Sequence, residues 1–154
     1  MSTIVGIDPG LEGAVAVVED GVLIDAFDLP HVDKILDAKD LAVRLQELNL
    51  NGTDIVVVEK VSAFPANGSI GNFKLGYSYG VISGVVKSLG LAMDTTAPTM
   101  WKKRLGLANK TKDASRLLVR DLFPDKRDLF ARKMDNGRSD AVCIALDYYR
   151  QHRV

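Results

Sequence analysis

The sequence contains little cysteine and little histidine. Its 154 residues include one cysteine, Cys143, and two histidines. A single cysteine cannot close a disulfide within the chain, and so few cysteine and histidine side chains argue against a Cys/His zinc site. Cys143 lies in an apolar helical pattern, which predicts a buried thiol. This cysteine usage fits a reducing compartment, so we expect a cytoplasmic protein.

Long apolar runs are also missing. No run reaches the roughly 18 to 20 residues that cross a membrane. The N-terminus, whose first charge is Asp8, lacks the basic-then-apolar layout of a signal peptide, and we therefore expect no membrane partner. The hydrophobic fraction of 47% and the charged fraction of 26% are those of an ordinary soluble globular protein. The length predicts a single domain over 1–154.

A net charge of zero conceals an uneven distribution. Residues 1–97 contain six Lys and Arg against thirteen Asp and Glu, whereas residues 98–154 contain fourteen against seven. A basic second part suits contact with a polyanion. A solvated helical surface without such a partner explains the charge equally well, so charge alone leaves both interpretations open.

Five segments have the pattern of β-strands. They are rich in β-branched and other apolar residues and are bounded by turn residues, over 3–8, 13–19, 21–28, 54–60 and 91–96. Asp20-Gly21, between the second and the third, is a tight-hairpin signal. The fourth segment, DIVVVEK, is almost wholly apolar, which predicts a central strand with both faces covered.

Helical patterns lie between and after these strands. They cover 37–50, 72–89, a short segment that starts at Pro98, 112–123 and about 138–152. Strands mixed with helices in this order predict an α/β fold with a five-stranded mixed sheet flanked by helices. Gly76, Gly80 and Gly84 share one face of the helix over 72–89, so we expect a sheet or a partner helix to pack closely there.

Three acidic residues stand at the ends of predicted elements. Asp8 ends the first strand in GIDPG, Glu59 ends the central strand in VVVEK, and Asp140 opens the last helix in SDAVCIALDYY. If the first and fourth strands are neighbours, Asp8 and Glu59 lie side by side, and a helix crossing that point adds Asp140. Converging carboxylates suit Mg²⁺ or Mn²⁺. Two such ions about 4 Å apart promote phosphodiester hydrolysis.

Each acid taken alone also has a simpler interpretation. Asp8 before Pro-Gly is a common turn former, and Glu59 can mark the exit of its strand to solvent beside Lys60. Asp140 lies near a helix start, where the helix dipole favours acids. Together these interpretations are weaker, because each acid borders an apolar run at a point where all three can meet.

The motifs resemble the RuvC-type Holliday-junction resolvases of the RNase H-like nuclease superfamily, and most closely the compact branch found in phages and prophages. The segments that carry the resemblance are GIDPGLEGAVAVV, VVVEKV, KLGYSYGVISGVV, PTMWKKRLGL, KDASR and GRSDAVCIALDYY, which together cover nearly the whole chain. The resemblance implies an RNase H-like fold and a protein that acts in a bacterial cell.

The resemblance also implies a set of metal ligands. Asp8 corresponds to the first ligand, expected to bridge two Mg²⁺ or Mn²⁺ ions, and Glu59 and Asp140 correspond to two others. The fourth position of the family, one helical turn before Asp140, usually carries Asp or His, but here it is Gly137.

Two nearby residues are candidates for the missing fourth ligand. Asp135 is the nearest substitute and is predicted as a metal ligand, and Asn136 offers a further oxygen. The alternative is that three carboxylates suffice together with water and DNA.

The basic part supplies the groups expected to bind DNA. In the family, lysines near the start of the helix over 112–123 lie close to the scissile phosphate. Lys112 is the best match and Lys103 the second. A lysine there offsets charge that develops in the transition state, so Lys112 is also a predicted catalytic residue. The full set of predicted DNA contacts is Phe64, Lys102, Lys103, Lys110, Lys112 and Arg138.

An aromatic residue follows the second acid. The family uses an aromatic near this point to stack at the junction crossover, where stacking contributes about 1–3 kcal/mol per base. Here Ser62 is nearer the usual place and Phe64 lies two positions further on. A Phe64 ring that folds back to anchor its own loop is an equally good interpretation. Trp101 is expected to be a core residue.

The resemblance therefore implies a metal-dependent, structure-selective endodeoxyribonuclease. It would resolve four-way DNA junctions by paired symmetric nicks, as a homodimer, with no small-molecule cofactor. Two alternatives remain open: an RNase H-like nuclease that cuts branched or flap DNA without strict junction preference, and a catalytically weak junction-binding module in which Gly137 breaks the metal site. An actin-like nucleotide-binding domain needs two such halves, which 154 residues do not hold.

Overall fold

A computed structural model describes residues 1–153 and contains a central five-stranded sheet. The strand order is β3-β2-β1-β6-β7. β1, β2 and β3 form an antiparallel meander, while β6 pairs parallel to β1 and β7 parallel to β6. The strands are β1 (Thr3–Asp8), β2 (Ala14–Glu19), β3 (Val22–Asp28), β6 (Ile55–Glu59) and β7 (Met93–Thr96). The predicted mixed sheet and the predicted neighbours, β1 and β6, are confirmed.

Five α-helices accompany the sheet, at the places that the periodicity predicts. They are α1 (Ala38–Glu47), α2 (Gly68–Ser88), α3 (Pro98–Arg104), α4 (Ala114–Leu122) and α5 (Asn136–His152). α2 begins at Gly68 rather than at residue 72, and α5 begins at Asn136 rather than near residue 138. No helix of residues 1–153 is long and apolar enough to cross a membrane.

Short elements in the connections are not evident from the sequence pattern. A two-stranded hairpin of β4 (His31–Val32) and β5 (Ile35–Leu36) precedes α1. The 3₁₀ segments are η1 (Pro65–Asn67), η2 (Pro124–Phe130) and η3 (Lys133–Asp135). These elements are too short to produce a hydrophobic period of their own.

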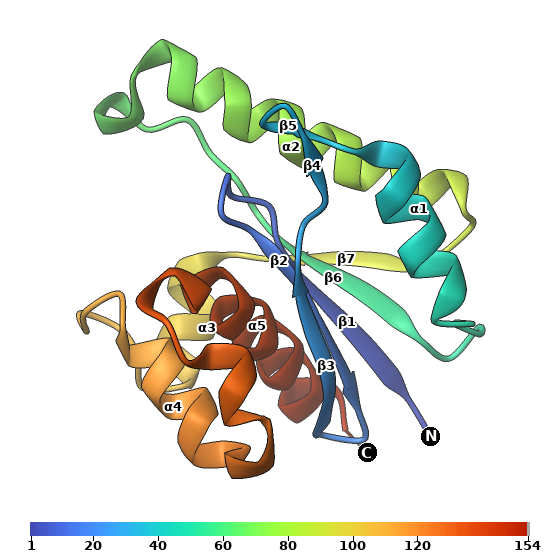
Figure 1. The fold of residues 1–154 in the computed structure, drawn as a ribbon. Helices are drawn as coiled ribbons and strands as arrows, with labels where there is room; N and C mark the ends of the chain where they lie inside the picture. The colour runs from blue at the N-terminus through green and yellow to red at the C-terminus, as the bar shows by residue number, and fades with distance from the viewer. Residues whose placement is uncertain (154) are drawn as a thin grey trace.

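The helices cover the two faces of the sheet in separate layers. α1 and α2 lie on one face, and α3, α4 and α5 lie on the other (Figure 1). Successive side chains of β1 point to opposite faces of the sheet. Val5 and Ile7 belong to the apolar cluster under α1 and α2, whereas Ile4 belongs to the cluster under α5. The residues of β1 with even numbers, Asp8 included, therefore face the α5 layer.

Two glycine positions explain the local geometry. Asp20 and Gly21 both have positive φ, 48° and 83°, in the two-residue loop that joins β2 to β3, as a type I′ hairpin turn requires. A Cβ on Gly6 would lie 2.2 Å from the carbonyl oxygen of Ala141. Gly6 therefore lets α5 approach the sheet closely, which carries the start of α5 toward the end of β1.

The glycine face of α2 points away from the rest of the chain. A Cβ on Gly76, Gly80 or Gly84 would meet no heavy atom within 4 Å among the described residues. The side that packs on the sheet is the opposite one, with Ser78, Ile82 and Val86. The prediction that the glycines pack on the sheet of the same chain is thus wrong. The alternative, that they pack on a partner helix, remains a prediction.

Candidate active site

Two of the predicted acids meet where β1 and β6 end. The parallel register pairs Ile7 with Val58, so Asp8 and Glu59 occupy the next positions on adjacent strands. Glu59 shares its face with Val57, a member of the cluster under α5. Both carboxylates therefore emerge on the same side of the sheet, at the edge where the two parallel strands end.

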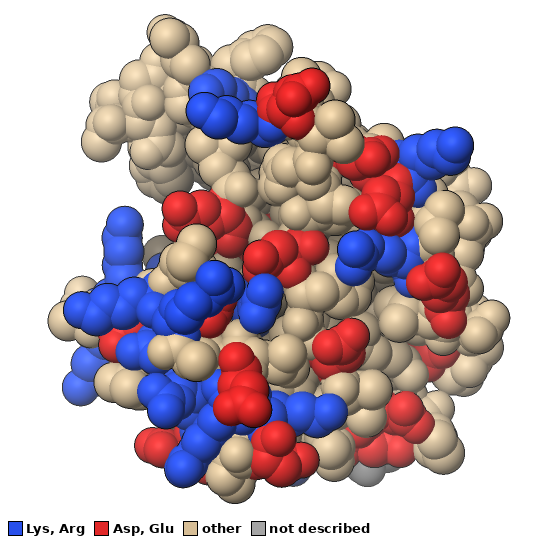
Figure 2. Space-filling model, in the orientation of Figure 1, with Lys and Arg blue, Asp and Glu red and all other residues tan. Residues whose placement is uncertain are grey.

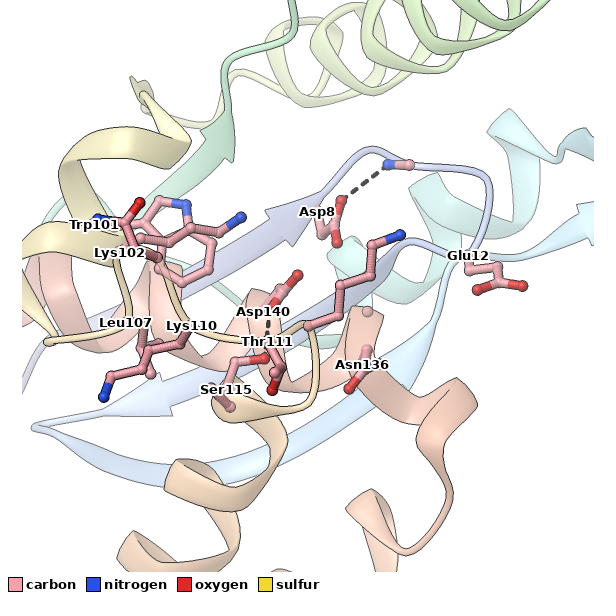
Figure 3. A pocket seen from close by; sticks show the side chains of 15 residues that line it. Asp8, Glu12, Trp101, Lys102, Leu107, Lys110, Thr111, Ser115, Asn136 and Asp140 are labelled. Carbon is pink, nitrogen blue, oxygen red and sulfur yellow. Dashed lines mark hydrogen bonds between the residues drawn. The ribbon is translucent and has the colours of Figure 1, made fainter. Parts of the chain in front are cut away.

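The third acid reaches this edge from α5. Asp140 lies in the first turns of the helix, and it lines a cavity of about 400 Å³ together with Asp8. In Figure 3, Asp8 extends from the end of β1 and Asp140 from α5 toward the same hollow. The remaining lining residues are Gly10, Glu12, Trp101, Lys102, Leu107, Asn109, Lys110, Thr111, Lys112, Ala114, Ser115, Asn136 and Gly137. Glu59 is not part of this lining, but it accepts a hydrogen bond from Trp101, which is.

Each of the three carboxylates is held through one oxygen by a different donor. The backbone N–H of Gly10 donates to Asp8 Oδ1 at 3.0 Å, Trp101 Nε1 donates to Glu59 Oε2 at 2.8 Å, and Ser115 Oγ donates to Asp140 Oδ1 at 2.6 Å. The second oxygen of each carboxylate accepts no hydrogen bond from the residues that the structure describes. Each acid is thus oriented and keeps one oxygen available.

Burial and mutual repulsion make these acids weaker than usual. Burial is the largest cause that raises the pKa of Asp8, and the nearby Glu59 and Asp140 add to it, so that the pKa reaches about 7. Burial also raises the pKa of Glu59 and of Asp140, against the hydrogen bonds from Trp101 and Ser115. Three carboxylates that resist ionisation side by side favour a bound cation.

The donor set fits a hard divalent cation, although the side chains do not yet enclose one. Among residues 1–153, no three His, Cys, Asp or Glu side chains are arranged closely enough to hold a metal ion. Asn136 lines the same cavity, and its Oδ1 is buried with no hydrogen-bond partner among the residues that the structure describes. Carboxylate and amide oxygens are the ligands that Mg²⁺ and Mn²⁺ prefer. Gathering them on one ion requires rotation of the side chains.

The structure gives a steric reason for the glycine at position 137. A Cβ there would lie 1.9 Å from the carbonyl oxygen of Glu12 and 3.0 Å from its carbonyl carbon. The turn between β1 and β2 therefore occupies the space that a side chain at this position would need. A ligand cannot project from residue 137 unless this turn moves.

Asp135 does not join the other acids. Its carboxylate accepts hydrogen bonds from the backbone N–H and the guanidinium of Arg132, the shortest at 2.8 Å, and lies 3.8 Å from Arg138. Its side chain is 2% exposed and does not line the cavity. The hydrogen bonds from Arg132 keep the pKa of Asp135 below its usual value, against the effect of burial. This carboxylate is used within η3 and not at the cavity.

The predicted basic residues divide into two groups. Lys102, Lys110 and Lys112 line the cavity, whereas Lys103 is exposed outside it. Arg138 donates to the Asp28 carboxylate at 2.8 Å and to the carbonyl of Leu129 at 3.0 Å, so its guanidinium is used within the chain. Figure 2 shows many Lys and Arg side chains over the part of the molecule that α3 and α4 form in Figure 1.

Phe64 lies on the connection between β6 and α2. The Asn72 side chain clamps its backbone, accepting from the Phe64 N–H at 3.1 Å and donating to the Phe64 carbonyl at 3.0 Å. The Phe64 side chain itself is 54% exposed. The backbone is anchored while the ring is left at the surface, so the ring does not serve as a buried anchor of its loop.

Sequence reasoning missed the groups that orient the acids. Trp101 is buried in the core, as expected, but its indole N–H also reaches Glu59. Ser115 joins Asp140 to Ser139 in a chain of hydroxyl contacts of 2.6 and 3.0 Å. No local sequence motif marks Trp101 or Ser115. The one signal for Ser115 would be its position on the apolar face of a helix that lies close to Asp140.

The chain is similar in sequence to one known enzyme. Part of the chain is 36% identical over 89 residues to the chloroplastic Holliday junction resolvase MOC1 of Chlamydomonas reinhardtii. The match covers 57% of this chain and 10% of that protein, so the chain spans about a tenth of the length of this relative. No family model matches the chain.

Solved structures show the fold. Thermus thermophilus RuvC in complex with a Holliday junction substrate superposes with a TM-score of 0.69 and 22% identity, over 99% of this chain and 97% of that one. A second structure of Thermus thermophilus RuvC superposes with a TM-score of 0.67 and 22% identity, over 97% of this chain and 96% of that one. The chain thus has the RuvC fold, and the predicted RNase H-like sheet is confirmed.

Proposed function

We propose that this chain is a metal-dependent endonuclease that resolves four-way DNA junctions by paired symmetric nicks, with residues 1–154 as one nuclease domain. The observation that carries the proposal is the cavity in which Asp8 and Asp140 face Lys102, Lys110 and Lys112. Acids that can hold a cation and lysines that can hold phosphates then line one hollow on a RuvC fold. The resolvase relative, MOC1, supports the choice of substrate.

The metal ligands we propose are Asp8, Glu59 and Asp140, through the oxygen that each keeps available. Asn136 Oδ1, which is buried without a partner among residues 1–153 and belongs to the residue before Gly137, is the fourth oxygen that we propose. We leave Asp135 out of the set, because Arg132 holds both of its oxygens. A pair of Mg²⁺ or Mn²⁺ ions supplies activation of the attacking water and stabilisation of the leaving oxygen when bound.

The side chains of the cavity divide the remaining work. Lys112 and Lys110, at the start of α4, stand where they can bind a phosphate and offset the charge that develops on it. The Lys102 charge opposes the rise in the pKa of all three carboxylates that burial causes, which favours the ionised form that binds a cation. The exposed Phe64 ring lies free to stack on a base near the crossover.

Paired nicking of a symmetric junction requires two active sites, so we propose a homodimer. The open glycine face of α2 is the surface proposed for it, because three glycines inside a helix otherwise only weaken that helix. The predicted cytoplasmic location belongs to the same proposal.

A second function is favoured by a specific observation. No three acidic side chains are close enough to hold a metal ion within residues 1–153, and position 137 has no side chain. A catalytically weak module that binds junctions would have the same basic surface. Cleavage, rather than binding, therefore decides between the two functions.

The deciding experiment is cleavage of labelled synthetic DNA in Mg²⁺. We expect paired nicks in a four-way junction and far less cutting of linear duplex, flap and RNA–DNA hybrid. Asp8→Asn and Asp140→Asn should abolish cutting while junction binding persists. Binding without cleavage by the wild type would establish the binding module, and equal cutting of flaps would establish a general branched-DNA nuclease.

A further inference from the structure

Trp101 connects the hydrophobic core to the carboxylate site. It is the only tryptophan in the chain and is fully buried in the cluster under α5. Its Nε1 donates to Glu59 Oε2 at 2.8 Å. The Lys102 ammonium lies over its ring, 5.3 Å from the ring centroid. One rigid side chain therefore contacts an acidic group and a basic group of the same site.

The contact restricts how the Glu59 side chain can point. A glutamate has three rotatable bonds, and a carboxylate free to rotate loses entropy when it binds a cation. The indole is fully buried and packs in the core cluster, so its N–H is held in one direction. Since the hydrogen bond uses Oε2, Oε1 is the atom left for a ligand. Glu59 and Asp8 occupy adjacent positions at the ends of β6 and β1, so this orientation acts beside the Asp8 carboxylate.

We propose that Trp101 is a positioning residue for the metal site, which sets the Glu59 carboxylate through the indole N–H and so determines its affinity for a divalent cation. The inference rests on the proposed function, because it assigns Trp101 a role toward the metal of that site. A tryptophan needed only for packing would require no hydrogen bond to this acid. Trp101 lines the cavity and holds Glu59 by its indole N–H, so it links this carboxylate to the cavity.

The test compares metal binding by two variants that each shorten a buried side chain of the same cluster. Trp101→Phe keeps an aromatic ring and removes the N–H. Val119→Ala is the matched control, because Val119 is fully buried in the same cluster but does not line the cavity. Mn²⁺ alone is titrated into each protein and its binding is measured by calorimetry. The affinity of Trp101→Phe for Mn²⁺ should be lower than that of the wild type by about tenfold or more, as is found when residues that orient metal ligands are removed. The control should bind Mn²⁺ as the wild type does.

Cleavage kinetics give a second readout. In Trp101→Phe the half-saturating Mn²⁺ concentration should rise by a similar factor, while the rate at saturating Mn²⁺ stays within a few-fold of the wild type. Mn²⁺ affinity equal to that of the wild type in Trp101→Phe would overturn the inference. An equal loss of affinity in Val119→Ala would also overturn it, because the effect would then come from general loosening of the core.

Fluorescence of the single tryptophan tests the inference even if Trp101→Phe does not fold. Mn²⁺ bound beside the indole should quench the emission of the wild type, and Glu59→Gln should remove the quenching. Emission that stays unchanged while calorimetry shows Mn²⁺ bound would place the metal away from Trp101 and overturn the inference alone. A wild type that binds no Mn²⁺ and cuts no junction would overturn the proposed function itself.

Discussion

At the scale of single residues, the Asp8 carboxylate is costly for the fold. It lies partly buried between Glu59 and Asp140, and its pKa is raised from 3.8 to about 7. The folded protein therefore holds a proton on Asp8 more tightly than the unfolded chain does. Because the unfolded state binds fewer protons between these two values, the stability of the metal-free protein falls as the pH rises through this range.

Asp8→Asn should therefore stabilise the metal-free protein while it removes the proposed activity. At pH 8 we expect an increase of roughly 1–3 kcal/mol, or about 3–10 °C in Tm, after allowing for partial screening by solvent. The gain should shrink toward pH 4, where Asp8 is protonated in the folded state. Calorimetric melting in EDTA at the two pH values measures it. The exposed substitution Glu47→Gln serves as the control, and an Asp8→Asn protein that melts below the wild type at pH 8 would contradict this account.

The same pKa predicts how metal binding depends on pH. A cation must displace the proton from Asp8, so Mn²⁺ affinity should rise by up to about tenfold per pH unit below pH 7 and level off above it. Calorimetric Mn²⁺ titrations from pH 5.5 to 8.5 measure this, and buffers of different ionisation enthalpy give the number of protons released. An affinity that is flat over this range would contradict the displacement of a proton from Asp8.

At the scale of elements, the site depends on two close backbone approaches to α5. Gly6 in β1 lets the helix reach the sheet, and Gly137 in the first turn of α5 lets the β1–β2 turn pass over it. Both contacts are made to backbone atoms, which cannot rotate away as a side chain can. The position of Asp140 above the ends of β1 and β6 follows from these two glycines.

Adding the carboxylate that Gly137 lacks should damage the protein instead of completing the site. In Gly137→Asp the new Cβ would lie 1.9 Å from the Glu12 carbonyl oxygen, so we expect a loss of about 1–3 kcal/mol or more and a Tm lower by several degrees. Gly52→Asp is the matched control, because it adds the same carboxylate at an exposed glycine whose Cβ would meet no heavy atom within 4 Å among the described residues. Thermal melting of both variants decides the matter. A Gly137→Asp protein as stable as the wild type would show that the turn moves readily.

The sequence predicts the elements of this site better than its contacts. Strand ends at Asp8 and Glu59, and the helix that carries Asp140, follow from hydrophobic runs and turn residues close to them in sequence. The contact between Trp101 and Glu59 spans 42 positions, and Gly137 meets Glu12 from a distant part of the chain. No local pattern encodes such pairs. The position of Asp135 in the sequence made it a reasonable candidate for the fourth metal ligand. Only the structure shows that its carboxylate is paired with Arg132.

At the scale of the whole molecule, the two faces of the sheet have different properties. The α3, α4 and α5 layer holds the acids and lysines of the cavity. The α2 layer extends beyond the sheet in Figure 1 and ends in a projection that shows no charge at its tip in Figure 2. Near that end, Ile70 and Phe73 are 72% and 73% exposed. Large exposed apolar side chains on one helix indicate a contact surface.

The glycine face of α2 allows a test of the proposed homodimer. If that face is solvated, Gly80→Lys should stabilise the helix by a few tenths of a kcal/mol, because lysine is the better helix former. If the face meets a second copy of the chain, the lysine should convert the dimer to a monomer and reduce paired nicking to single nicks. Analytical ultracentrifugation at micromolar protein measures the mass. Gly52→Lys is the control, because Gly52 is equally exposed and its Cβ would also meet no atom, yet it lies outside α2. A Gly80→Lys protein that still dimerises like the control would place the interface on another surface.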